Sequence, residues 1–135
     1  MNKEINKIIK MAIYAGKIML ENGAETYRVE ETVKRICYSQ GIKNLDIFVI
    51  PTGIFVTCNY DGEVYSFIKR VKKFKIDLHI IDLVNDFSRK LKSKIIDIDL
   101  IMNRLSKIEK APEFSRVIKL LFGGITGGFF SLMFN

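Results

Sequence analysis

The sequence predicts an α+β domain with a transmembrane helix at its C-terminal end. Two stretches with the apolar spacing of helices open the chain, the apolar period then falls to two, and helical spacing returns near Asp77. Strands kept apart from helices in this way are typical of α+β folds. A glycine-rich segment almost without charge follows. We therefore expect two N-terminal helices, a three-stranded antiparallel sheet, two further helices and a C-terminal transmembrane helix.

Length and composition limit the classes of protein. The 135 residues, 48% of them hydrophobic, are enough for one compact domain with a core of its own. The net charge of +7 is compatible with nucleic acid, an anionic membrane surface or an acidic small molecule as partner. Cys37 and Cys58 have no CxxC spacing and His79 is the single histidine, so we predict buried reduced thiols, no metal and no cofactor.

The first two helices are predicted over about Lys3 to Asn22 and about Glu25 to Gln40. Gly23 and Gly41 follow them directly, in the position where a left-handed glycine ends a helix. Each helix should bury one apolar face. The residues at helical spacing include Ile5, Ile8, Ile9, Ala12, Ala15 and Met19 in the first helix and Val29, Val33, Ile36 and Cys37 in the second.

Three strands are predicted next, over Leu45–Ile50, Ile54–Tyr60 and Glu63–Val71. Pro51-Thr52-Gly53 forms a tight break and Asp61-Gly62 a two-residue hairpin turn. A type I′ turn there would fix the register of the hairpin and hence the faces of the sheet. Tyr60 would then pair with Glu63, Val56 and Cys58 would share a face with Tyr65 and Phe67, and Thr57 would lie opposite Ser66.

The remaining helices of the domain follow a basic run between Lys69 and Lys75. We expect this run to be solvated or to face anionic lipid headgroups, because Phe74 is its single aromatic residue and nucleic-acid surfaces interleave more of them. Asp77 is the predicted N-cap of one helix, and Asp97 or Asp99 starts the next. Their apolar residues are Leu78, Ile81, Val84, Phe87 and Leu91, then Ile101, Leu105 and Ile108, before a loop with Pro112.

The glycine-rich segment is predicted to cross a membrane. The 18 residues from Val117 to Phe134 carry one charge, that of Lys119, and about 18 apolar residues are the threshold for a membrane span. In a buried helix of a soluble domain, each of its glycines would cost about 1 kcal/mol relative to alanine. In lipid, glycines at four-residue spacing let helices pack closely. The pairs are Gly123 with Gly127 and Gly124 with Gly128.

Basic residues precede this segment, as expected of its cytoplasmic side; they are Lys107, Lys110, Arg116 and Lys119. We therefore divide the chain into a cytoplasmic α+β domain, 1–112, and a first transmembrane helix, 113–135. One helix with two glycine pairs needs partner helices, so we expect a second membrane subunit or further transmembrane helices, and a second copy of the chain is another candidate.

The densest polar cluster lies at the junction of the first two helices, around Glu25, Thr26, Arg28 and Glu30. A helix N-terminus suits a carboxylate ligand, and Arg28 could add a bidentate contact to it. Alternatively, the glutamates complement the helix dipole while Thr26 caps the helix. Spacing alone favours the second interpretation.

Other functions find little support in the residues. A helix-turn-helix reader of DNA would not have a neutral second helix with acids at its leading end. The chain holds no G-x-S-x-G, Walker or H-E-x-x-H motif, and His79 near Asp77 and Asp82 is a weak basis for nucleophilic catalysis. We therefore expect neither a nucleic-acid binder nor an enzyme.

Two motifs resemble those of the threonine/serine exporter-like family. The first is Ala15-Gly16 followed by Leu20–Thr32, which reads LENGAETYRVEET, with a Gly-Ala-acid-Thr turn before Arg-Val-Glu. The second is Ile50–Ile54, similar to the strand-turn-strand motif of the family. The helix from Asp77 and the glycine-rich segment come in the expected order, so the resemblance spans nearly the whole chain.

The resemblance implies a bacterial inner-membrane protein with a cytoplasmic N-terminal domain followed by several transmembrane helices. Members are linked to export of threonine and serine or of dicarboxylates such as succinate, often with a second small membrane subunit. It makes Gly23, Pro51, Thr52 and Gly53 structural motif residues and Glu25, Thr26, Arg28 and Glu30 candidate substrate-binding residues. This chain stops within the predicted first membrane helix, so we expect a fragment or a split subunit. A membrane-tethered ligand-binding or hydrolase-like domain is the alternative.

Overall fold

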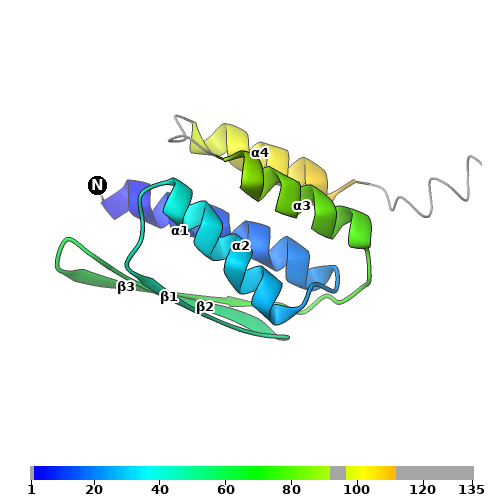
Figure 1. Cartoon of the computed structure of the whole chain (residues 1–135), viewed down its shortest axis with the longest axis horizontal. Coiled ribbons are helices and arrows are strands. Elements are labelled where there is room, and N and C mark those ends of the chain that lie inside the picture. Colours follow the sequence, from blue (N-terminus) through cyan, green and yellow to red (C-terminus); the bar gives the residue numbers. More distant parts are fainter. Residues whose placement is uncertain (1, 92–96, 112–135) are drawn as a thin grey trace, which may run out of the picture.

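A computed structural model describes residues 2–91 and 97–111. It confirms the α+β class, with four helices and a three-stranded antiparallel sheet (Figure 1). None of the helices in these two ranges is both long and apolar enough to cross a membrane. The predicted transmembrane helix, 113–135, lies outside the described residues. The elements are α1 Asn2–Glu21, α2 Thr26–Ser39, β1 Leu45–Ile50, β2 Gly53–Tyr60, β3 Glu63–Arg70, α3 Leu78–Lys90 and α4 Ile98–Glu109.

The elements form three layers, with α1 in the middle one. Helices α1 and α2 lie side by side on one face of the sheet, and α3 and α4 lie on the side of α1 that faces away from the sheet (Figure 1). Helix α1 therefore contacts α2, α3, α4 and two strands. Its second half is buried on nearly every side, which explains why apolar residues there are not confined to one stripe. The largest fully buried side chains of α1 are Ile9, Met11, Ile18 and Met19.

The sheet has the order β1-β2-β3 and the predicted register. Asp61 and Gly62 both have positive φ, 54° and 80°, as a type I′ turn requires, and Tyr60 pairs with Glu63. Gly53 belongs to β2 and pairs with Ile50, so the break between the first two strands is only Pro51-Thr52, one residue shorter than predicted. The predicted pairs Val56–Phe67, Cys58–Tyr65 and Thr57–Ser66 are all present.

The uncovered face of the sheet is also apolar. Phe48, Phe55 and Ile68 form one cross-strand row on it, and the rings of Phe48 and Phe55 are 6.0 Å apart. Phe48 and Ile68 are exposed, with 62% and 75% of their surface accessible. On the covered face, Ile54, Val56 and Cys58 are buried under the helices. The alternation of apolar and polar residues thus predicted the buried face of the sheet correctly but did not predict the apolar row on its exposed face.

The helix ends are those expected, with one exception. Gly23 and Gly41 have φ of 96° and 85° and end α1 and α2 in Schellman motifs, each with paired hydrogen bonds back into the last turn. Asp77 and Asp97 cap α3 and α4. Thr26 does not cap α2: it is the first residue of the helix, and Glu25 holds the N-cap position without a side-chain capping bond.

Helices α1 and α2 approach closely at Gly16. A Cβ atom there would lie 2.7 Å from Cγ2 of Val33 and 3.1 Å from Cγ1 of Val29, too near for any side chain to fit without movement. Both valines are fully buried, so they have no free space to move into. The glycine of the Ala15-Gly16 pair therefore sets the spacing of the two helices that cover the sheet.

We expect Gly16→Val to lower the free energy of unfolding of the domain by about 1–3 kcal/mol, because it overpacks this contact. In a Val33→Ala background the same substitution should have a smaller effect, since the removed methyl groups leave room. Urea unfolding of the four proteins of this cycle measures both effects. An equal loss in the two backgrounds would show that Gly16 does not act through Val33.

Candidate functional site

The two motifs of the sequence meet at one small hollow, about 270 Å³ in volume. It lies where α1 ends and α2 begins, next to the β1–β2 turn. Gly23, Glu25 and Thr26 from the first motif and Pro51 from the second line it, and Phe74 closes one side. We call it the motif hollow; its full lining is Leu20, Gly23, Ala24, Glu25, Thr26, Pro51 and Phe74.

Arg28 and Glu30, the other two predicted binding residues, do not line the motif hollow. Glu30 has a structural partner, because its Oε1 accepts the backbone N–H of Val49 at 3.2 Å and so satisfies a donor on the edge strand β1. Arg28 is half-buried and makes no hydrogen bond or salt bridge to the part of the chain that the structure describes. Of the predicted set, the structure thus brings only Glu25 and Thr26 together around a cavity.

The C-terminal end of α1 is tied to the segment that follows β3. The backbone N–H of Lys75 donates to the carbonyl of Glu21 at 2.9 Å, and that of Asp77 donates to the carbonyl of Asn22 at 3.0 Å. These bonds satisfy carbonyls that the end of a helix leaves open. A Cβ atom on Gly23 would lie 3.3 Å from the carbonyl oxygen of Lys75, so a side chain there would press on this segment.

Asn22 and Asp77 each keep one buried oxygen without a partner. The amide Nδ2 of Asn22 donates to the Ile18 carbonyl at 2.6 Å, which leaves its Oδ1 unpaired among the described residues. Oδ1 of Asp77 accepts two backbone N–H groups of α3, and Oδ2 is unpaired within the same ranges. Because unpaired buried acceptors are costly, such atoms point to a missing donor.

A larger cavity, about 480 Å³, is also lined by Phe74 and lies between α1, the segment after β3 and the end of α4. Its size is that of a small-molecule site. Most of its lining is charged, and basic residues predominate. We call it the lysine groove; it is lined by Lys17, Glu21, Asn22, Lys73, Phe74, Lys75, Glu109 and Lys110.

A charge network joins α1 to α4 inside this groove. Nζ of Lys17 lies 3.8 Å from Oε2 of Glu21 and 3.6 Å from Oε2 of Glu109, and the side chains of both glutamates are mostly buried. The hydroxyl of Tyr14 donates to Oε1 of Glu109 at 2.8 Å. Burial, and then the Glu109 carboxylate, raises the pKa of Tyr14 to about 12. Tyr14 therefore stays a neutral donor at physiological pH.

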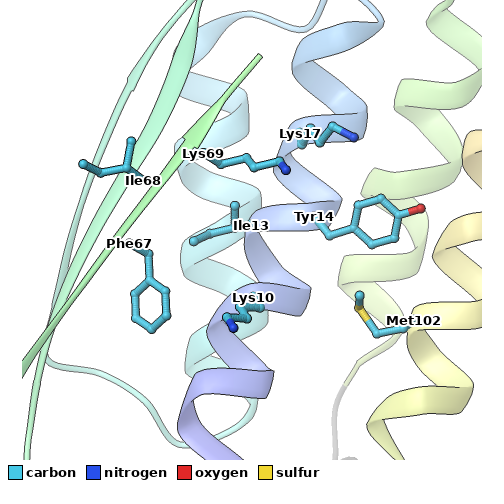
Figure 2. A pocket seen from close by; sticks show the side chains of 8 residues that line it. All are labelled: Lys10, Ile13, Tyr14, Lys17, Phe67, Ile68, Lys69 and Met102. Atoms are coloured by element: carbon cyan, nitrogen blue, oxygen red, sulfur yellow. The ribbon is translucent and has the colours of Figure 1, made fainter. Parts of the chain in front are cut away.

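A third hollow, about 420 Å³, continues along α1 from Lys17 toward its N-terminus (Figure 2). Figure 2 shows Tyr14 pointing toward α4 while Lys69 of β3 points toward α1. Ile13, Phe67 and Met102 make this hollow more apolar than the lysine groove. Lys17 lines both cavities, which therefore lie next to each other along α1.

Sequence reasoning missed the lysine groove. The sequence feature that could have predicted it is the pair Lys17 and Glu21, four residues apart on a helix that is otherwise apolar there. Their partner Glu109 lies far along the chain, and no local pattern places α4 against α1. The basic run around Lys73 was predicted to be solvated or to face lipid, and the glutamates that share its cavity were not predicted.

The cysteines and the histidine considered in the sequence analysis have no site of their own among the described residues. Cys37 and Cys58 are buried free thiols, and burial raises the pKa of Cys37 to about 12, so it is unreactive. Asp77 accepts the backbone N–H of His79 in its role as a cap. Within residues 2–91 and 97–111, no cluster of three or more His, Cys, Asp or Glu side chains could hold a metal ion.

Comparison with known proteins places these features in a family context. The family described as "Putative threonine/serine exporter" matches residues 10–135. A relative from Klebsiella aerogenes, "Probable succinate transporter subunit YjjP", is 23% identical over 132 residues, which are 98% of this chain and 51% of the relative. The chain thus spans about half the length of that curated relative. No solved structure matches the chain. The family match covers both motifs, the lysine groove and the glycine-rich segment.

The Tyr14–Glu109 contact predicts a loss of stability at high pH. The pKa of Tyr14 is raised from 10.0 to about 12, so its contribution to stability is complete below pH 10 and is lost as the pH rises from 10 to 12. Tyr14→Phe should flatten the fall in the free energy of unfolding over this interval, and Tyr60→Phe, at another half-buried tyrosine, should not. Urea unfolding at stepped pH tests this, and identical slopes for wild type and Tyr14→Phe would contradict it.

Proposed function

The chain belongs to the threonine/serine exporter family, and from this premise we propose that it is a component of an inner-membrane exporter of small metabolites. The cargo is a threonine- or serine-like amino acid or a dicarboxylate such as succinate. The observation that supports this most is the extent of the family match, which runs from α1 through the glycine-rich segment. A match limited to the α+β domain would say nothing about transport.

The proposed roles of the two parts of the chain rest on the sequence. Residues 1–112 form a cytoplasmic domain, and residues 113–135 form the first transmembrane helix, with the basic residues at its cytoplasmic side. The paired glycines pack this helix against others, which belong to a second membrane subunit, to further transmembrane helices or to a second copy of the chain. The relative's description as a transporter subunit is in keeping with a multi-part assembly.

The residues around the motif hollow are the proposed cargo contacts on the cytoplasmic side. Glu25 and Thr26 line the hollow, and Arg28 lies one helical turn from Glu25 with a guanidinium not used within the described structure. Arginine binds carboxylates in a bidentate manner, and both cargo classes carry a carboxylate. Glu30 supports this region through its bond to β1 rather than through direct contact.

We expect Arg28→Ala to reduce efflux of amino acid or dicarboxylate from cells carrying the intact transport system, because a carboxylate contact on the cytoplasmic side is lost. Arg89→Ala, which removes an exposed arginine from α3, is the matched control and should leave efflux unchanged. Efflux is followed with a radiolabelled cargo at equal expression. Normal efflux from the Arg28 variant would remove this residue from the mechanism.

The orientation of the domain has its own test. Because Cys37 and Cys58 are buried, a cysteine introduced at exposed Lys43 should be the reactive thiol of the domain. In intact spheroplasts an impermeant maleimide should not label Lys43→Cys, whereas inverted vesicles should be labelled fully. Labelling of spheroplasts would place the domain on the outer side of the membrane.

A further inference from the structure

The floor of the lysine groove holds an excess of negative charge. The two carboxylates of Glu21 and Glu109 share one ammonium group, that of Lys17, at 3.8 and 3.6 Å. The side chain of Glu21 is 11% exposed, so solvent screens it little. Tyr14 contributes a neutral hydrogen bond and no charge. The floor can therefore accept one more cationic donor.

An unpaired acceptor lies beside these carboxylates. Asn22 is only 3% exposed, and it lines the groove next to Glu21. Its amide nitrogen must face the Ile18 carbonyl, which can only accept, and this fixes Oδ1 as the unpaired atom. Asp77, which has the other unpaired oxygen, is joined to Asn22 by a backbone hydrogen bond. A ligand with several N–H donors could bind both Glu21 and the Asn22 oxygen, which has no donor among the described residues.

The other charged residues of the groove have the reverse charge, and we call Lys73, Lys75 and Lys110 its wall. These three lysines make no salt bridge among the described residues, whereas Lys17 is occupied by the two glutamates. Unpaired lysines facing a cavity attract a carboxylate. The groove thus presents an ammonium-binding floor and a carboxylate-binding wall within a cavity of about 480 Å³.

We propose that the lysine groove binds a small α-amino acid as its zwitterion. The ammonium group is held by Glu21 and Asn22, and the carboxylate is held by the lysines of the wall. A dicarboxylate fits poorly, because its second carboxylate would face the acidic floor and it has no donor for Asn22. This inference rests on the proposed function for the role of the ligand, and it narrows the cargo to amino acids at this site.

The groove lies close in sequence to the predicted membrane helix. Glu109 is the last residue of α4, and Lys110 follows it directly. Both line the groove, and the predicted membrane helix, 113–135, begins shortly after them in the sequence. A bound amino acid would therefore bridge α1 to the end of α4, which adds contacts between the middle layer and the residues that lead into the membrane.

The test is calorimetric titration of the full chain, purified in detergent, with L-serine and L-threonine. Analogues separate the two halves of the site: N-acetyl-L-serine lacks the ammonium group, L-serinamide lacks the carboxylate, and succinate lacks any donor. We expect both amino acids to bind and all three analogues to bind at least tenfold more weakly, the effect of one lost charged hydrogen bond. Succinate binding as tightly as L-serine would overturn the proposal.

Substitutions then locate the ligand. Glu21→Gln keeps the size of the side chain and should weaken L-serine binding about tenfold or more, while Glu31→Gln, an exposed glutamate of α2 outside the groove, should not. Lys73→Gln with Lys75→Gln should weaken L-serine but affect L-serinamide much less. Unchanged affinity in Glu21→Gln, with the variant folded by circular dichroism, would overturn the assignment.

Three further outcomes separate this site from the proposed function and from a lipid surface. If efflux from cells is normal but no amino acid binds, the groove is not an amino-acid site and the exporter function stands. If L-serine binds but cells show no efflux, the site stands and the exporter function does not. If the Lys73/Lys75 variant loses binding to vesicles of anionic phospholipid while L-serine does not bind, the wall is a lipid-facing surface and the proposal is wrong.

Discussion

The burial of α1 between two layers is the constraint on which the rest of this structure depends. A helix that touches the sheet on one side and two helices on the other has almost no exposed surface in its second half. Each large apolar side chain buried there stabilises the fold by about 1.5–3 kcal/mol. Any polar residue in the same stretch must find an internal partner. Gly16 is needed for the same reason, because α2 lies against α1 with no room for a Cβ atom.

The polar residues at the end of α1 show how this constraint generates a site. Because α1 is buried, the polar residues Lys17, Glu21 and Asn22 at its end are largely buried too. Glu109 pairs with Lys17, and Tyr14 donates a hydrogen bond to Glu109. Pairing is incomplete, since Oδ1 of Asn22 has no donor among the described residues. Incomplete pairing at a cavity differs from incomplete pairing in a packed core, because a ligand can supply what the chain does not.

Local chemistry made most of the fold predictable. Asp61-Gly62 fixed the hairpin register, and Gly23, Gly41 and Asp77 marked helix ends, because each depends on backbone geometry within a few residues. Thr26 was wrongly taken as a cap, since Glu25 and Thr26 compete for one position and sequence bounds are uncertain by a residue. The lysine groove was not predictable, because it depends on how α4 crosses α1, and the Tyr14–Glu109 bond spans 95 residues.

Phe74 connects the motif hollow, whose residues the sequence predicted, with the lysine groove, which only the structure revealed. It lines both the motif hollow and the lysine groove, and it lies in the segment joined to α1 through Lys75 and Asp77. That segment also supplies two lysines of the groove wall. A ligand bound by those lysines would therefore contact the same segment that contributes Phe74 to both cavities. Because Gly23 lies against the Lys75 carbonyl, a shift of the segment would also reach the family motif at the start of α2. The segment after β3 thus contacts both the family motif and the lysine groove.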